Sequence, residues 1–273
     1  MLRRLAPFSL LLAASCLVHF GWGTPRAWTT GERAFEVDPA DLSQVTCATH
    51  NGDVHVSGAE SADRIRVHVR TRAGGEDAAD AAAAHEAIEI LHKRVDGGLW
   101  LGWRWREPHR RSWQASVSFD VEQPRSMPSR VESHNGDLRV RGIDAAVTAE
   151  SHNGDLALLE CGGELRGTTH NGDIEAATSG PVLQLTTHNG AMRIRIVGVG
   201  PTEGEVRSHN GSITLAVDEG RSARLVCTTR NGRLRSQRQI DRQERGRNFL
   251  VADLGDGAGR LAVETYNGSI RVE

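Results

Sequence analysis

Apolar and polar residues alternate along most of this chain, in short runs separated by turn residues. Val147, Ala149 and Ser151 alternate with polar residues before an Asn-Gly pair, and Leu156 and Leu158 continue the alternation after it. An alternation of period two is typical of a half-buried β-strand. The pattern therefore predicts an all-β protein built from short strands.

Eight Asn-Gly pairs mark the turns between these runs, and six of them follow a histidine. From the second pair onward the steps are 18, 18, 18, 21, 21 and 36 residues, and 36 is twice 18. A fixed short period indicates one structural module stacked on copies of itself. We expect Asn-Gly to turn the chain because glycine adopts a positive φ freely and asparagine tolerates it. The asparagines are Asn51, Asn135, Asn153, Asn171, Asn189, Asn210, Asn231 and Asn267.

Two arrangements of these strands fit the repeat. Asn-Gly commonly closes a β-hairpin, and a series of hairpins gives an antiparallel meander. The second connection of each unit, however, is looser and variable, as in residues 142–145, 161–164 and 178–181. One fixed and one variable corner per unit favours a coil of two strands. We therefore predict a parallel β-solenoid, a single-stranded β-helix with 18–21 residues per coil.

Parity assigns the two faces of each strand before the Asn-Gly corner. Residues two, four and six positions before each asparagine are Thr or Ser, then small or apolar, and these are expected to point inward. The residue directly before the asparagine then points outward. Six histidines should form an exterior column with steps of about 4.8 Å, the strand spacing, and Arg230 and Tyr266 take that place in the last two units. The histidines are His50, His134, His152, His170, His188 and His209.

Residues 71–123 interrupt the repeat and are expected to form an insertion. An Ala-rich helix at 76–87 is followed by a hairpin of 88–95 with 99–105, and a strand at 113–121 pairs with that hairpin. Four tryptophans lie in the insertion, and we expect them to cap the open end of the solenoid. An exposed aromatic binding patch is the alternative. They are Trp100, Trp103, Trp105 and Trp113.

A second interruption, residues 236–248, is charged and predicts a surface loop. Strands at 249–254 and 260–272 then resume and close the stack. Residues 24–273 are thus expected to form one solenoid domain.

Residues 1–23 are typical of a signal peptide, with a basic start and an apolar segment too short to span a membrane. Ala13-Ala-Ser-Cys16 resembles a lipobox, in which the lipoprotein signal ends at residue 15 and Cys16 is lipidated. Simple cleavage after Gly23 is the alternative. In both cases we expect an exported protein, in the periplasm, in the outer membrane or at the cell surface.

The net charge bears on nucleic-acid binding, and the cysteines bear on whether disulfides are expected. A net charge of −2 offers no electrostatic basis for nucleic-acid binding. Three cysteines remain after Cys16, and Cys47 and Cys227 should lie in one inward column, about six coils or roughly 29 Å apart at the strand spacing. A disulfide needs Cα atoms within about 7 Å, so no disulfide framework is expected.

Four units read His-Asn-Gly-Asp, so an imidazole and a carboxylate stand at the two ends of one turn. The first of these pairs is His50 with Asp53. Three consecutive coils repeat the pair, which suits weak zinc binding; the alternative is a set of ladders that satisfy one another. No other cofactor is expected. These metal candidates are His134, Asp137, His152, Asp155, His170 and Asp173.

The stacked histidines also suggest a response to pH, since imidazoles that titrate near neutrality repel one another when protonated. A polysaccharide-active enzyme is a further alternative, because parallel β-helices host such enzymes. The carboxylates here belong to the repeat, and no catalytic residue is predicted. Strand-face arginines could meet anionic glycans or lipid headgroups, or be ordinary solvated residues. They are Arg139, Arg141, Arg193, Arg195 and Arg207.

Several segments together resemble one known family. They are the Asn-Gly-Asp-Val-His-Val56 coil, the helix and hairpin, the Val117-Ser-Phe-Asp-Val-Glu-Gln-Pro124 strand and the Asn-Gly-Ser-Ile-Arg-Val272 ending. The pattern resembles the bacterial β-strand-repeat family of unknown function whose members are named candidate adhesins, over nearly the whole mature chain. The resemblance implies surface attachment and transfers no site residue.

We therefore predict an exported, non-catalytic envelope protein that acts as an adhesin-like binding or scaffold module. Its expected partner is an envelope protein or a glycan, with no nucleic acid. Membrane contact is expected only through a lipid on Cys16.

Overall fold

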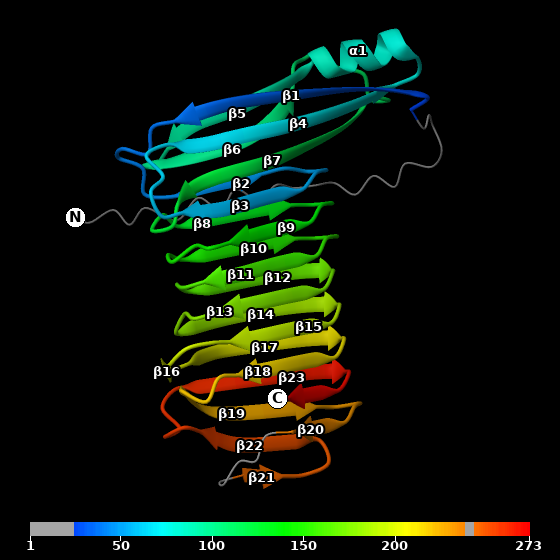
Figure 1. Ribbon diagram of the computed structural model, residues 1–273. Helices are drawn as coiled ribbons and strands as arrows, with labels where there is room; N and C mark the ends of the chain where they lie inside the picture. Colours follow the sequence, from blue (N-terminus) through cyan, green and yellow to red (C-terminus); the bar gives the residue numbers. More distant parts are fainter. Residues whose placement is uncertain (1–24, 238–242) are drawn as a thin grey trace, which may run out of the picture.

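The computed structural model describes residues 25–237 and 243–273, which form two sheets of stacked strands and one short helix, α1 (Ala78–Glu86) (Figure 1). Each regular coil gives one strand to each sheet. Along the middle of the stack the neighbouring strands are parallel, with Val147 opposite Leu165 and Leu156 opposite Ile174. Parallel pairing rules out the meander and is consistent with the predicted β-solenoid.

The order of the strands across each sheet differs from their order along the chain. Sheet A contains, from one edge to the other, β1 (Ala27–Val37), β4 (Ile65–Gly75), β7 (Gln114–Pro124), β3 (Val54–Ala59), β9 (Leu138–Arg141), β11 (Leu156–Cys161), β13 (Ile174–Thr178), β15 (Met192–Ile196), β18 (Ile213–Val217), β24 (Ile270–Val272) and β20 (Leu234–Ser236). Sheet B contains β21 (Gln243–Arg245), β22 (Phe249–Leu254), β19 (Arg221–Thr229), β23 (Arg260–Asn267), β17 (Glu203–Asn210), β14 (Val182–Asn189), β12 (Leu165–Asn171), β10 (Val147–Ser151), β8 (Ser129–Ser133), β2 (Val45–Ala48), β6 (Gly98–Trp105) and β5 (Ile88–Val95), with β16 (Gly200–Pro201) beside β19.

The core between the sheets follows the predicted parity. Leu183, Leu185 and Thr187 of β14 are buried, while the residues between them are exposed. The same alternation recurs in the neighbouring coils, so the interior is a thin double layer of aliphatic side chains. Burial of these apolar columns supplies the main stabilisation of each coil.

At seven of the eight corners, the Ser or Thr that lies two residues before the asparagine donates its hydroxyl to a corner glycine carbonyl of the adjacent coil, as Ser151 does to Gly136 at 3.1 Å and Thr169 to Gly154 at 2.9 Å. At the first corner, Thr49 donates to the Val117 carbonyl at 2.8 Å instead. The inward placement of these hydroxyls is as predicted. Each buried hydroxyl thus satisfies a carbonyl that no strand neighbour reaches.

The corner glycines are required for a different reason from the predicted one. Of the eight glycines in the Asn-Gly pairs, only Gly52 has a positive φ, 148°. A Cβ on Gly154 would instead overlap the carbonyl oxygen of Gly136, and the same overlap recurs at the corresponding corners. Glycine is therefore needed for the close approach of successive backbones, and the expectation of a left-handed turn was wrong.

The eight corner asparagines form one ladder of side-chain amides. Each amide nitrogen from Asn135 onward donates to the amide oxygen of its neighbour at 2.7 to 2.8 Å. The ladder fixes the register of the coils at this edge of the stack. Its order is Asn51, Asn135, Asn153, Asn171, Asn189, Asn210, Asn267 and Asn231.

The insertion forms the upper end of the stack. The predicted helix is present, with Asp77 as its N-cap, and β5 and β6 form the predicted hairpin, which joins sheet B through β2. Contrary to the prediction, β7 does not pair with that hairpin but with β3 and β4 in sheet A. The chain crosses between the sheets after β6, as it does at every coil, so its next strand falls in the opposite sheet.

The last coil is out of sequence order. β23 lies between β17 and β19, and β24 lies between β18 and β20, so residues 260–272 separate two coils that precede them in the chain. The stack ends at β20 in sheet A and at β22 and β21 in sheet B. Residues 249–254 thus lie at the end of the stack as predicted, whereas the prediction that residues 260–272 close it was wrong. Cys47 and Cys227 are seven corner steps apart along the asparagine ladder, and both are buried and free.

The segment predicted as a charged loop also contains a strand, since β21 pairs antiparallel with β22. No helix in the described part of the chain is long and apolar enough to cross a membrane.

Gly154→Ala is expected to destabilise the protein by about 3 kcal/mol, the upper end of the usual range for overpacking. The new methyl group meets the Gly136 carbonyl and displaces the Ser151 hydroxyl bound there. Urea unfolding measures the change. Gly162→Ala is the matched control, because a Cβ there first meets the Asp144 side chain at 3.1 Å, and an equal loss in both variants contradicts the corner mechanism.

Candidate functional site

The predicted histidine column is present and continuous. The six rings are parallel to within 4° and stand 4.7 to 4.9 Å apart, from His50 to His209. Tyr266 stacks on His209 at 4.9 Å, and the Arg230 guanidinium lies 4.9 Å from the Tyr266 ring. All are exposed except His134, which is half-buried. The column follows the spatial order of the coils, which places Tyr266 before Arg230.

Partial burial and neighbouring rings change the acid–base behaviour of two column members. Partial burial, followed by the charge of His50, lowers the pKa of His134 below its ordinary value. Partial burial, followed by the charges of His134 and His170, does the same for the pKa of His152. His134 and His152 therefore take up a proton less readily than a free imidazole.

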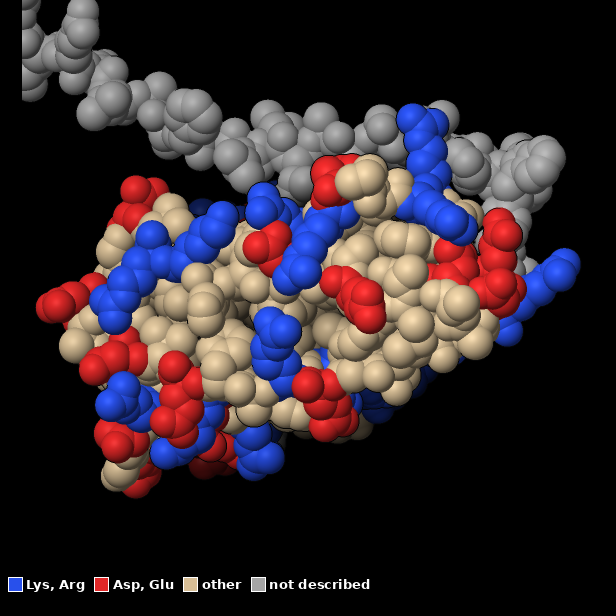
Figure 2. Space-filling model, turned by 90° about the horizontal axis from the view of Figure 1, so that it is seen from above, with Lys and Arg blue, Asp and Glu red and all other residues tan. Residues whose placement is uncertain are grey.

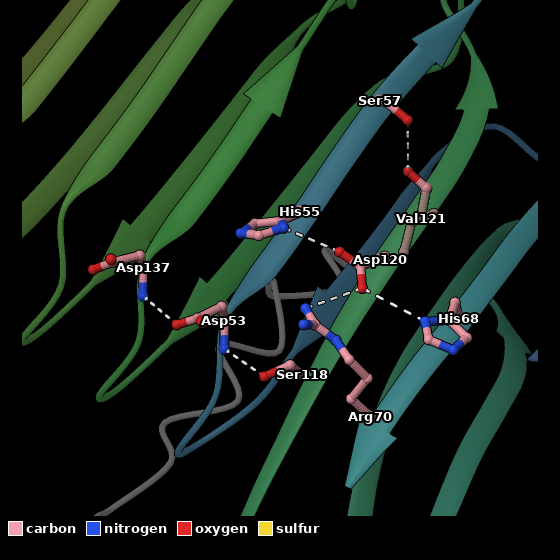
Figure 3. Close-up of polar contacts among 9 residues, drawn as sticks. All are labelled: Asp53, His55, Ser57, His68, Arg70, Ser118, Asp120, Val121 and Asp137. Carbon is pink, nitrogen blue, oxygen red and sulfur yellow. Dashed lines mark hydrogen bonds and ion pairs between the residues drawn. The ribbon is translucent and has the colours of Figure 1, made fainter. Parts of the chain in front are cut away.

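The repeated aspartates form a ladder of their own on the sheet A side of the corner. Asp53 accepts the backbone N–H of Asp137 at 3.0 Å, and its own N–H donates to Ser118 at 3.1 Å (Figure 3). Asp137 and Asp155 accept the next backbone N–H groups at 2.9 and 2.8 Å. Asp173 continues the ladder to Ala191 at 2.7 Å. Each of these carboxylates thus binds the main-chain amide directly before a strand of sheet A in the adjacent coil.

The histidines and aspartates of the metal prediction lie on different sides of the corner. The groove lined by Asp53, Asp137, Asp155 and Asp173 contains none of the column histidines. Within residues 25–237 and 243–273, no three His, Cys, Asp or Glu side chains are arranged so that they could hold a metal ion. Weak zinc binding by these six residues stays a prediction.

Tryptophans of the insertion lie above the histidine column, on the same side of the molecule. Trp105 makes an edge contact with Trp103 at 5.5 Å, a tilted contact with Trp113 at 5.8 Å and a stack on His109 at 5.6 Å. The Trp103 indole N–H donates to Thr49 at 3.2 Å. Trp103, Trp105 and Trp113 also pack on the core, as the predicted cap requires, while part of each ring stays accessible. Trp100, the fourth tryptophan of that prediction, is not among the residues packed on the core and lines the groove instead.

A buried carboxylate holds this aromatic cluster against the helix. Asp80 of α1 accepts the Trp113 indole N–H at 2.9 Å, the Arg110 guanidinium at 2.8 Å and the Glu76 backbone N–H at 2.9 Å. The bonds from Trp113 and Glu76, and behind them the Arg110 charge, lower the pKa of Asp80. The sequence pattern does not single out this carboxylate, because it lies in an Ala-rich helix with no motif.

The tryptophans and the ring column line one continuous groove. Its upper part has a volume of about 1760 Å³ and its lower part about 720 Å³, and the two share Ser151, His152 and Thr168. We call this surface the Trp–His groove. It is lined by Trp28, Trp100, Trp103, Trp105, Trp113, His50, His134, His152, His170, His188, His209 and Tyr266.

A polar cluster lies on the outer face of sheet A near the same end. Asp120 lies between His55, at 3.0 Å, and His68, at 3.7 Å, and it also binds Arg70 at 3.1 Å (Figure 3). Glu32 contacts the other nitrogen of His68 at 3.3 Å. Arg70 supplies a cation to Asp120 from the neighbouring strand, and the two imidazoles surround the same carboxylate, so the cluster is a network of cross-strand polar contacts.

The strand-face arginines do not form one basic patch. Arg139, Arg141, Arg193 and Arg195 are exposed on sheet A, whereas Arg207 lies on sheet B beside Glu264 at 3.4 Å. Arg141 pairs with Glu160 at 2.7 Å. At the upper end of the stack, acidic and basic side chains are interspersed (Figure 2). Mixed charge gives little attraction for a polyanion on these surfaces.

The predicted signal peptide and lipid anchor concern residues 1–23 and Cys16, which are not among the described residues, so both stay predictions.

Burial raises the pKa of the Cys47, Cys161 and Cys227 thiols, and these cysteines behave as small core residues.

The chain resembles solved structures of bacterial candidate adhesins over about nine tenths of its length. A candidate cell adhesion protein from Clostridium sporogenes ATCC 15579 is 12% identical, with coverage of 89% of this chain and 99% of that chain and a TM-score of 0.41. A candidate adhesin from Bacteroides fragilis NCTC 9343 is 11% identical, with coverage of 92% and 100% and a TM-score of 0.36. A candidate lipid binding protein from Parabacteroides distasonis ATCC 8503 is 9% identical, with coverage of 89% and 96% and a TM-score of 0.41.

These matches agree with the resemblance seen in the sequence. No family model matches the chain. No curated protein matches it.

Thermal stability is expected to fall between pH 8 and pH 5. Because the pKa values of His134 and His152 are lowered on folding, the unfolded chain takes up protons more readily than the folded chain. Their contribution to stability is complete above the ordinary histidine pKa of about 6.5 and is lost as the pH falls through the lower folded values. Melting temperatures measured by calorimetry across this range test the direction.

His152→Gln is expected to reduce that pH dependence, because it removes one titrating ring and the charges it places beside His134 and His170. His92→Gln, an exposed histidine outside the column, is the control. A melting temperature that is flat from pH 5 to 8 in the wild-type protein contradicts the prediction.

Asp80→Ala is expected to lower the melting temperature and to shift tryptophan fluorescence to the red, because Trp113 loses its indole acceptor. The Asp80 pKa is lowered on folding, so its contribution is present above the ordinary aspartate value of about 3.9 and is lost as the pH falls through the folded value. The difference between wild type and variant should therefore close in acid. Glu86→Ala, an exposed carboxylate on the same helix, should match wild type throughout.

Proposed function

We propose that the chain is an exported, non-catalytic protein of the cell envelope that acts as an adhesin-like binding or scaffold module. The observation that carries this proposal is the Trp–His groove, which runs along the stack and presents aromatic rings at a regular spacing. Concave surfaces lined by apolar and aromatic side chains, with a few convergent polar groups, are the usual form of ligand-binding sites.

The hydrogen bonds of the repeated aspartates support the non-catalytic part of this proposal. Asp137, Asp155 and Asp173 each accept a backbone N–H of the adjacent coil. An aspartate committed to the main chain of the next coil is a structural group, whereas a glycosidase needs a pair of carboxyl groups free to act on one bond. A polysaccharide-active enzyme is therefore the less favoured alternative.

Export and attachment rest on the first 23 residues, with Cys16 as the proposed lipid anchor. In this proposal the groove faces the exterior of the cell or the periplasm, and its partner is an envelope protein or a glycan. The core is independent of disulfides, since all three cysteines of the described chain are free.

The purified mature protein is expected to be retained on isolated envelope fragments in a sedimentation assay. Thr168→Arg should abolish most of that retention, because Thr168 is exposed where the two parts of the groove meet. Glu175→Arg, the equivalent outward position on sheet A, is the matched control and should be retained as well as wild type.

Retention that is equal in Thr168→Arg and wild type, or retention of neither, contradicts the proposal. Mass spectrometry of the envelope-associated protein should show an N-terminus at Cys16 with its lipid or at Thr24, and an uncleaved N-terminus contradicts export.

A further inference from the structure

We infer that the Trp–His groove binds a linear, uncharged polysaccharide chain, whose sugar rings lie along the stack. This inference rests on the proposed function, because it names the ligand class of the same groove. Three features carry it: flat aromatic platforms, balanced charge and an extended shape without free backbone edges.

Trp100 provides the clearest platform. It lies on the outer face of β6, and a Cβ added to Gly102 would overlap its six-membered ring. The six-membered ring therefore lies over the strand at Gly102, and Trp100 also lines the groove. Trp28, 42% exposed, has the Arg72 guanidinium over one face of its ring, 4.0 Å from the centroid. An exposed aromatic face with its negative quadrupole attracts the C–H face of a pyranose ring.

The charges of the upper groove largely cancel. Glu89, Glu107, Glu132 and Glu150 line it together with three arginines, and several of these groups already pair with one another. Arg104 binds Glu89 at 2.6 Å, and Glu107 contacts His109 at 2.8 Å. Such a surface offers donors and acceptors side by side, which suits hydroxyl groups because each hydroxyl both donates and accepts. It offers no net attraction to a polyanion.

The shape of the groove favours a polymer over a compact ligand. Below the tryptophans the surface continues along six ring-to-ring steps of 4.7 to 4.9 Å, from His50 to Tyr266, with Ser and Thr hydroxyls beside the rings. A repeating ligand can place equivalent groups on equivalent histidines. Neutral imidazole both donates and accepts, so the column can bind hydroxyls along its whole length.

A peptide is less suited to the same groove. Peptides that bind sheets commonly add a strand, which needs an edge with free backbone N–H and C=O groups. The strands that form the floor of the groove, β2, β8, β10, β12 and β14, are each paired on both sides. A peptide would therefore find side chains but no backbone partner.

Isothermal calorimetry and tryptophan fluorescence with neutral β-1,4-linked hexasaccharides of glucose, N-acetylglucosamine, xylose and mannose test the inference. At least one should bind saturably, and its disaccharide should bind far more weakly because it spans fewer column steps. Trp100→Ala should weaken binding about tenfold, the size expected from losing one stacked aromatic group. Arg193→Ala, on the opposite sheet, should bind as wild type does.

No saturable binding to any of the four sugars at millimolar concentration overturns the inference, as does binding unchanged by both Trp100→Ala and Trp28→Ala in variants that melt as wild type does. If the sugars fail but envelope fragments still retain the protein, the proposed function stands and the ligand is not a neutral glycan. Loss of that retention after protease treatment of the fragments then identifies a protein partner. If the envelope assay also fails, the proposed function itself is wrong.

Discussion

Everything regular in this molecule depends on the contact between successive corner glycines. The backbone of one coil approaches the carbonyl of the next so closely that no side chain fits, and a Ser or Thr hydroxyl binds the same carbonyl from inside. A ladder of asparagine amides lies beside this contact. Close approach, buried hydroxyl and amide ladder together leave one register, and the aliphatic columns can pack only in that register.

The fixed register determines which repeated side chains are available to a ligand. Asparagine and aspartate are used within the corner, the first between side chains and the second on main-chain amides. Histidine is the one polar residue of the motif that the corner leaves outside. Because the coils cannot slip, the six imidazoles are held at a nearly constant spacing, and the groove inherits its regularity from the glycines.

The features that the sequence predicts well are local. Parity along one strand is enough to place Thr187 inside and His188 outside, and the period is enough to stack equivalent residues. The role of the glycines was misjudged because a close approach between coils leaves no mark in the sequence that distinguishes it from a left-handed turn. The positions of β7 and β23 in their sheets were also predicted wrongly, because no residue in either strand specifies which strand it pairs with. Asp80 was missed because its partners, Arg110 and Trp113, are 30 and 33 residues away.

The position of β23 has a consequence for how the chain acquires its shape. Strands β8 to β18 can be added one coil at a time as they leave the ribosome, each on an edge that the preceding coil has completed. That sequence stops at β19, whose native neighbour is encoded by residues 260–267. Only the start of β19, at Arg221 and Ser222, pairs with the earlier chain, through β16, and the rest of β19 must wait for that later strand. The edge of β17 stays open meanwhile, and an alternative in which β19 occupies it must be undone before the native order is reached.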